Sequence, residues 1–346
     1  MRNISFAQAL NEAMRQEMER DPTVFVYGIG VPDHKGIFGS TEGLLEQFGP
    51  ERCFDTPLAE EAMTGFGLGA AVGGMRPIHI HIRVDFLILA INQLVNMIAT
   101  YSYSTEGRSG VPIVIRVVVG RGWGQGYQHS KSLHSWFAHI PGLKVVLPTT
   151  PRDAKGMLTA AIREENPVVF IEHRWLYWAE EDVPEEPYTV DLTTGHILRA
   201  GSDMTVVATS WMNIEALRAA DILARRGVNI EVVDPRVIAP FDDAIVIDSV
   251  DKTRHCIVAD PDWLNCGFSA EVAARVSEKN FGRLKSAVTR IGFAETPTPT
   301  VRSLENEFYP NAVDIIRAVE TKLDLDPIDL SGEEFYSYEK RFKGPF

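Results

Sequence analysis

Short apolar runs alternate with segments of helical periodicity along most of this chain, and that alternation constrains its fold more than any other feature. The apolar runs have the length of buried strands, and they lie at 24–27, 77–82, 112–119, 144–147 and 167–171. Helical segments are predicted between several of these runs, at 62–74, 86–104 and 153–164. Strands that alternate with helices in this way form a parallel sheet covered on both faces. The sequence therefore predicts an α/β fold.

A further helix is predicted at the start of the chain. Ser5 is a suitable N-cap residue, and Gln8, three residues later, completes the pattern of a capping box. Apolar residues then recur on one helical face, namely Phe6, Leu10, Ala13, Met14 and Met18.

A second set of alternating elements follows a stretch rich in proline and glutamate. That stretch, 181–200, is predicted to be an exposed linker. After it, strands are predicted at 204–209, 229–233, 255–259 and 288–292, and helices at 211–226, 269–282 and 311–322. The sequence thus predicts a domain over 1–180, a smaller α/β domain over 201–322, and a tail over 323–346 that is either free or packs on a partner.

The composition excludes several classes of partner. The formal net charge is −13, whereas nucleic acid binding needs a basic face that neutralises phosphates. Cys53, Cys256 and Cys266 are far apart and show no disulfide or zinc spacing. The sequence shows no apolar run of about 18 residues and no signal-peptide core. We therefore predict no nucleic acid partner, no membrane span and a cytoplasmic location.

Two loops carry the residue types that catalysis needs. Residues 55–61 directly precede the glycine-rich helix, and residues 120–130 directly follow the predicted strand at 112–119. In a parallel sheet, ligands bind in the loops that follow the carboxyl ends of the strands. The glycines of the second loop permit unusual backbone conformations. They place Gln128 and His129 at a predicted site.

Each of these residues also has a structural interpretation. Glu60 could serve as a cap or a dipole partner at a helix start, and His129 could be an ordinary loop residue. His79 and His81 lie two residues apart, so they share one face of a strand. They could bind a metal as a pair, but packing within the sheet is the favoured interpretation, and no metal is predicted for this chain.

Taken together, several motifs in a fixed order resemble the beta subunits of pyruvate and branched-chain 2-oxo acid dehydrogenase complexes. The motifs are GFGLGAAVGGMRP, DFLILAINQLVN, GYQHSKS and FIEHRWLY. The resemblance covers residues 4–322 and is strongest over 41–177. It implies a pyrimidine-binding, transketolase-like domain followed by a transketolase C-terminal domain.

The resemblance also implies the cofactor thiamine diphosphate and assigns roles to residues. The family motif D-T-P-x-x-E falls on 55–60, so Glu60 matches the carboxylate that hydrogen-bonds a pyrimidine ring nitrogen. That bond favours the imino tautomer, which removes the proton from the thiazolium carbon. Leu58 matches an apolar contact to the pyrimidine, and Phe86 matches the aromatic residue that stacks on it. His129 matches the histidine that handles protons, and Gln128 is placed beside the cofactor.

A missing motif predicts a partner. Related enzymes hold the magnesium ion of thiamine diphosphate with Gly-Asp-Gly followed by asparagine, and Gly-Asp-Gly does not occur in this sequence. The resemblance therefore implies that a separate alpha subunit holds most of the Mg²⁺ site, in an α2β2 heterotetramer. A lipoyl acyltransferase core is a further partner that the family implies, and the substrate is a small 2-oxo acid.

Some positions depart from the family pattern. Residues 28–31 are Gly-Ile-Gly-Val where an acidic pair is usual, and Lys279, Arg283 and Lys285 replace an acidic stretch. A basic surface would meet a basic acyltransferase domain unfavourably. The leading hypothesis is a 2-oxo acid dehydrogenase beta subunit, and the alternative is an acyloin-forming or transketolase-like two-subunit enzyme.

Two other classes of protein fit less well. A scaffolding subunit that kept the fold would have no reason to retain Glu60 together with Phe86 and His129. A nucleotide-binding protein would show a GxGxxG or P-loop motif after a strand, and the sequence has neither.

Overall fold

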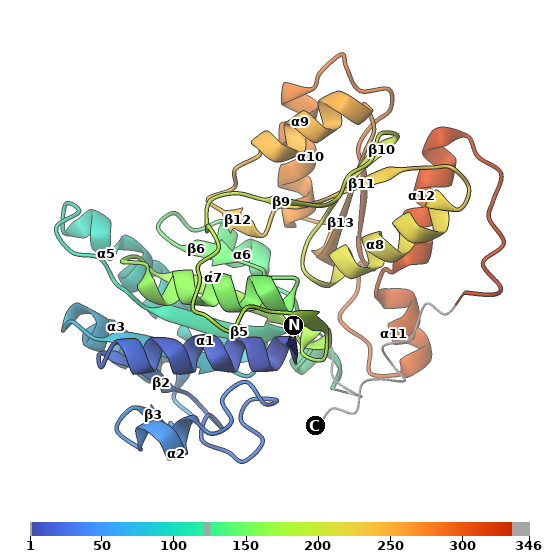
Figure 1. Ribbon diagram of the computed structural model, residues 1–346. Helices are drawn as coiled ribbons and strands as arrows, with labels where there is room; N and C mark the ends of the chain where they lie inside the picture. Colours follow the sequence, from blue (N-terminus) through green and yellow to red (C-terminus); the bar gives the residue numbers. More distant parts are fainter. Residues whose placement is uncertain (1, 121–124, 334–346) are drawn as a thin grey trace. The chain divides into compact units, whose positions relative to one another are not determined.

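The computed structural model describes residues 2–120 and 125–333, which form two compact units divided after Leu192 (Figure 1). The boundary between the two units falls inside the predicted linker at 181–200. Its first part follows β8 (Glu180–Asp182), which pairs antiparallel with β1 (Asn3–Ser5) in the first unit. Its last part contains β9 (His196–Arg199), which joins the sheet of the second unit.

A parallel sheet forms the centre of the first unit, as the sequence predicts. Each neighbouring pair of strands is parallel. In sheet order the strands are β6 (Lys144–Val146), β7 (Val168–His173), β5 (Val114–Val119), β4 (Arg76–His81), β2 (Val24–Tyr27) and β3 (Cys53–Phe54). All side chains of β2 and β5 are buried, which explains their continuous apolar sequences.

Helices cover this sheet, and the predicted capping box is confirmed. The Ser5 hydroxyl accepts from the Gln8 amide at 3.2 Å, and the Gln8 side chain accepts from the Ser5 amide at 2.8 Å. The first helix, α1 (Phe6–Arg20), packs beside α7 (Pro151–Arg163), as Figure 1 shows. The helices of this unit outside 84–104 are α1 (Phe6–Arg20), α2 (Leu44–Phe48), α3 (Glu60–Val72), α6 (His134–Ala138) and α7 (Pro151–Arg163).

The segment 86–104 is helical, as predicted, but it is divided among four helical elements and does not form one regular α-helix. These are α4 (Val84–Leu87), a 3₁₀ turn (Ile88–Ala90), a π-helical turn (Gln93–Ile98) and α5 (Ala99–Ser104). The break comes where the segment packs on α3, and Asn92 there donates to Glu61 at 3.0 Å. Tertiary packing thus overrides the local helical pattern.

Membrane-spanning potential is weak in the described part of the chain. No single helix there is long and apolar enough to cross a membrane. The bent pair 84–90 and 93–104, with an angle of 61° at its break, passes by length and composition alone.

The second unit has its own sheet, in the order β14-β13-β10-β11-β9. Its strands are parallel except for β9, which runs antiparallel to β11. The elements predicted there are confirmed, as β10 (Met204–Ala208), β11 (Ile230–Asp234), β13 (Cys256–Trp263), β14 (Thr289–Phe293), α8 (Trp211–Ala224), α10 (Phe268–Lys279) and α12 (Ala312–Leu323). Four further elements of this unit were not predicted, β9 (His196–Arg199), β12 (Val237–Ala239), α9 (Ala244–Thr253) and α11 (Arg302–Phe308).

A buried ion pair joins two central strands of the first sheet. Arg116 on β5 donates to Glu172 on β7 at 2.5 and 2.9 Å, and both side chains are fully buried. Ser40 accepts from the same guanidinium at 3.1 Å, and the Tyr177 hydroxyl donates to Glu172. These bonds hold together the two strand ends that lead into the loops described next.

Candidate active site

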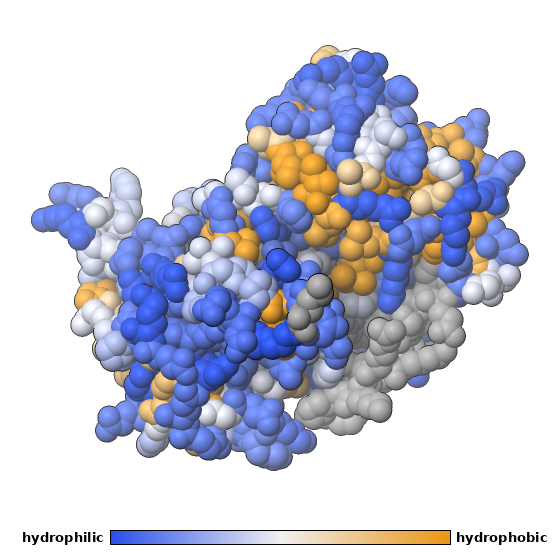
Figure 2. All heavy atoms as spheres, in the orientation of Figure 1, coloured by the Kyte–Doolittle hydropathy of each residue, from blue (hydrophilic) through white to orange (hydrophobic). Residues whose placement is uncertain are grey.

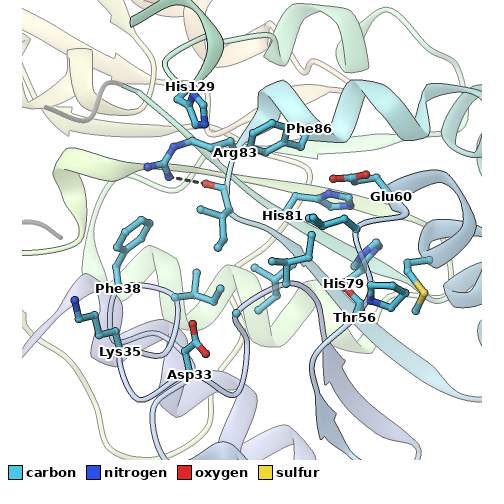
Figure 3. A pocket seen from close by; sticks show the side chains of 18 of the residues that line it. Asp33, Lys35, Phe38, Thr56, Glu60, His79, His81, Arg83, Phe86 and His129 are labelled. Atoms are coloured by element: carbon cyan, nitrogen blue, oxygen red, sulfur yellow. Dashed lines mark hydrogen bonds between the residues drawn. The ribbon is translucent and has the colours of Figure 1, made fainter. Parts of the chain in front are cut away.

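A pocket of about 410 Å³ lies at the carboxyl end of the first sheet (Figure 3). Four segments line it, within 29–38, 56–63, 79–86 and 125–129. The segment 29–38 follows β2, the segment 79–86 includes the end of β4, and the segment 125–129 follows β5. Loops after parallel strands build ligand sites in this way, so the pocket lies where the sequence places it.

Glu60 enters the pocket from the first turn of α3 (Figure 3). The loop before it is held by Asp55, whose carboxylate accepts from the backbone amides of Gly30 at 3.0 Å and Thr56 at 2.8 Å. The Glu60 side chain is half-buried, and it has no hydrogen-bond partner among the residues that the structure describes. A carboxylate held in this position can accept a hydrogen bond from a ligand.

Phe86 and His129 lie together in the same pocket. Their ring centroids are 5.3 Å apart, and the rings meet edge to face at 83°. Phe86 is held by α4, whereas His129 directly follows a 3₁₀ turn at Gly126–Gln128. Leu58 also lines the pocket, with 82% of its surface exposed. The structure therefore brings four of the five predicted site residues to one cavity.

Gln128 is the exception. Its side chain is exposed, and it is not among the residues that line the pocket. The 3₁₀ turn carries the Gln128 side chain toward the surface and returns the chain to the pocket at His129. Gln125, three residues earlier, lines the pocket in its place.

The histidines of β4 are packed in the sheet and also reach the pocket wall. His79 stacks on Tyr27, with ring centroids 4.3 Å apart, and lies 4.2 Å from the ring of His81. Burial lowers the pKa of His79 well below its usual value and lowers that of His81 to about 3. Both rings are therefore neutral at ordinary pH. In the described ranges, neither belongs to a cluster of three potential metal ligands.

A cationic cluster in and beside the pocket was not predicted from the sequence. Arg83, at the end of β4, is 3% exposed and lines the pocket. It donates to the side-chain oxygen of Gln125 at 2.8 Å, and Arg174 donates to the same oxygen at 3.0 Å. Both guanidinium groups lie on the ring of Phe38, at 5.4 and 4.6 Å. The arginine that directly follows the strand at 77–82 was the available signal.

Burial also lowers the pKa values of the two arginines in this cluster. It lowers the pKa of Arg83 to about 10, and it lowers that of Arg174, with help from the charge of Arg83, to about 9. Both groups stay positively charged at neutral pH, in surroundings where a charge is costly without a partner.

Two protein-family models together match most of this chain. Residues 2–178 match the family described as "Transketolase, pyrimidine binding domain", and residues 193–315 match "Transketolase, C-terminal domain". The chain is 39% identical to acetoin:2,6-dichlorophenolindophenol oxidoreductase subunit beta of Cupriavidus necator, over 92% of this chain and 96% of that protein. It is 38% identical to mitochondrial pyruvate dehydrogenase E1 component subunit beta-2 of Oryza sativa subsp. japonica, over 92% of this chain and 85% of that protein.

A solved structure shows the same fold. It is titled "Split gene transketolase, inactive beta4 tetramer" and superposes with a TM-score of 0.74 at 20% identity. The match covers 94% of this chain and 99% of that one.

Proposed function

Because the chain belongs to the transketolase-like family of 2-oxo acid dehydrogenase beta subunits, we propose that it activates thiamine diphosphate for the decarboxylation of a 2-oxo acid. One observation carries this proposal. The Glu60 carboxylate shares a pocket with Phe86 and His129, and no described residue occupies its hydrogen-bonding capacity. A cofactor pyrimidine needs a carboxylate at one ring nitrogen and apolar contacts on its faces.

The residues of the pocket fit that cofactor. Leu58, Met63 and Phe86 offer apolar surface near Glu60, and the wall is completed by neutral histidines. Thiamine diphosphate, when bound, supplies a carbon nucleophile and an electron sink. Glu60 would accept the hydrogen bond of a pyrimidine ring nitrogen and so favour the reactive tautomer. His129 would hold or deliver a proton through a ring nitrogen.

The remaining half of the site is proposed to come from an alpha subunit in an α2β2 assembly. The sequence lacks the Gly-Asp-Gly motif for magnesium, and this chain offers an apolar surface for a partner. On the face of the first unit drawn in Figure 2, around α1, hydrophilic residues predominate. Exposed apolar side chains instead occur on α3 and the segment 88–104 that packs on it, namely Phe66, Val72, Leu89, Met97 and Tyr103.

This surface gives a testable prediction about assembly. Leu89→Asp is expected to prevent or strongly weaken complex formation with the alpha subunit, because it would bury an unpaired charge. Leu89 is 58% exposed in the isolated chain, so the fold itself should tolerate the change. The mass of the co-expressed proteins, measured by light scattering after size exclusion, would show the loss.

A matched control is available in the second unit. Leu304 on α11 is also 58% exposed, and Leu304→Asp introduces the same charge outside the proposed surface. The proposal predicts an intact assembly for this variant. If both variants lost assembly to the same extent, or if neither lost it, the assignment of the α3 surface to the alpha subunit would be contradicted.

A second candidate function is acyloin formation or ketol transfer, and one observation favours it. Ile29 and Gly30, within the segment 28–31, line the pocket at the place where the family pattern implies an acidic pair. The relative named as an acetoin oxidoreductase subunit does not favour acyloin formation, because its named activity is an oxidation. The basic residues at and after the end of α10 give less support than expected. Lys279 is 2.6 Å from Asp243 and Arg283 is 2.5 Å from Asp251, so neither presents an uncompensated charge to an acyltransferase core.

The two functions are separated by the acceptor that the enzyme uses. We would co-express the chain with its alpha subunit and measure carbon dioxide release from a panel of 2-oxo acids in the presence of thiamine diphosphate and Mg²⁺. Reduction of a dye or acyl transfer to a lipoyl domain supports the dehydrogenase function. Product formed only with an aldehyde acceptor supports acyloin or ketol chemistry, and no turnover with any donor refutes both. The predicted cytoplasmic location stays a prediction.

A further inference from the structure

The candidate site has a basic side that the proposed cofactor chemistry does not use. Figure 3 shows Arg83 close to His129 and Phe86, with its guanidinium directed away from Glu60 toward the side of the pocket where Phe38 lies. Decarboxylation through thiamine diphosphate needs the Glu60 carboxylate and a proton donor, but it does not need a buried guanidinium. The following inference concerns that guanidinium and rests on the proposed function.

Arg83 has hydrogen-bonding capacity to spare. A guanidinium has five N–H donors. In the described residues, one Arg83 nitrogen donates to the Ile82 carbonyl at 2.8 Å and another to Gln125 at 2.8 Å. The third nitrogen, Nε, is buried and has no partner in the described ranges. Leaving a buried donor of a charged group unsatisfied is costly, so an acceptor that reached this guanidinium would be bound favourably.

In the described residues, no carboxylate forms an ion pair with Arg83. The charge of Asp85 favours that of Arg83, but one Asp85 oxygen accepts from Lys131 at 2.8 Å and the other has no hydrogen-bond partner in those residues. Asp33 and Lys35 also line the pocket, are exposed and carry opposite charges. Phe38 and Gln125 hold the guanidinium in place without neutralising it. An anion on the ligand would supply the missing charge.

The chemistry of the reaction indicates which anion this is. The carboxylate that leaves loses its charge as carbon dioxide forms, and the bonding electron pair stays on the former carbonyl carbon. A guanidinium bound to that carboxylate would stabilise the ground state more than the transition state and would slow the step. An anionic group that keeps its charge throughout the reaction can be held by Arg83 without this penalty.

We propose that Arg83 binds a second anionic group of the substrate, a carboxylate or a phosphate remote from the reacting carbonyl carbon. The group belongs either to the 2-oxo acid donor or to an aldehyde acceptor. Arg83 is then a specificity-determining residue, and the enzyme selects acidic substrates over neutral ones of the same size.

The test uses the α/β assembly loaded with thiamine diphosphate and Mg²⁺. One arm compares 2-oxoglutarate with its neutral distal amide as donors, and the other compares glyceraldehyde 3-phosphate with glyceraldehyde as acceptors. In at least one arm, kcat/KM for the anionic substrate should exceed that for the neutral one by about tenfold or more, as expected for a charge-assisted hydrogen bond. The arm that shows the preference identifies the source of the anion.

Substitution of Arg83 then separates recognition from a structural role. Arg83→Gln should bring the preference close to one, mainly through a higher KM for the anionic substrate, because the distal charge is bound equally in ground and transition states. Arg83→Lys keeps the charge and should restore part of the preference. A structural role would instead lower kcat/KM for both substrates by the same factor and leave the ratio unchanged, and that outcome would overturn the proposal.

The unmodified enzyme provides an outcome that does not depend on variants. If it decarboxylates 2-oxo acids and shows no anionic preference in either arm, the Arg83 proposal is wrong and the proposed function stands. If it decarboxylates no 2-oxo acid, the proposed function fails first, and the Arg83 proposal falls with it.

Discussion

Glu60→Gln is expected to lower kcat of the α/β enzyme by about two to four orders of magnitude, the range for loss of a group that controls a proton in catalysis. The amide is nearly isosteric with the carboxylate, but it presents an N–H group as well as an oxygen and carries no charge. It cannot stabilise the pyrimidine tautomer as a carboxylate does. Because Glu60 is half-buried and has no partner among described residues, the change should leave the fold intact.

The neighbouring residue supplies the control. Glu61 lies one position along α3, is exposed, and accepts a hydrogen bond from Asn92 outside the main pocket. Glu61→Gln removes the same charge from the same helix end, so it tests whether the helix dipole alone explains the effect. Steady-state rates with saturating cofactor, together with thermal unfolding curves, measure both variants. Equal rates for the two glutamine variants would refute the role of Glu60.

Arg116→Met is expected to lower the free energy of unfolding by about 3–5 kcal/mol, the cost of leaving one member of a buried ion pair alone. Glu172 would lose two charge-assisted hydrogen bonds in a fully buried place, and Ser40 would lose its bond to the guanidinium. The strands concerned, β5 and β7, lead to the loop of His129 and to Arg174. Loss of stability should therefore be accompanied by loss of activity. Urea unfolding followed by circular dichroism gives the free energy.

A second variant distinguishes loss of packing from an unpaired charge. Adding Glu172→Leu to Arg116→Met removes the stranded carboxylate, so the double variant should be more stable than Arg116→Met alone. Arg108→Met is the surface control, because Arg108 and Glu106 form an ion pair with both side chains exposed. It should cost less than about 1 kcal/mol. A double variant less stable than the single one would show that packing, rather than the unpaired charge, dominates.

The local part of the fold could be predicted from the sequence. The capping box at Ser5 and Gln8 depends on residues three apart, and the buried strands depend on short apolar runs. These signals lie within one element, so neighbours in the chain suffice to produce them. The helix at 86–104 was predicted by the same reasoning and is broken, because its packing on α3 is a long-range effect that periodicity does not contain.

The candidate site could be predicted in part. Glu60, Phe86 and His129 were identified through their motifs, and the pocket brings them together. Gln128 does not line this pocket, because a single 3₁₀ turn decides which side chain of that loop faces the cavity, and its contact with the cofactor stays a prediction. Arg83 was missed because its position directly after the strand at 77–82, the available signal, does not by itself distinguish a site residue from an ordinary surface arginine. The place of Arg83 in the site depends on its contacts with Phe38 and Gln125, which are distant from it in the chain.

The sequence by itself determined the type of most elements, the family and the carboxylate proposed to activate the cofactor. Each of these depends on residue types and spacings within a short stretch of chain. Only the tertiary structure decided which strand ends adjoin. The order β7-β5-β4-β2 places the loop after β5 and Arg174 after β7 beside Arg83 at the end of β4. Strand order arises from packing between segments far apart in the chain, and it therefore decided where the basic side of the pocket lies.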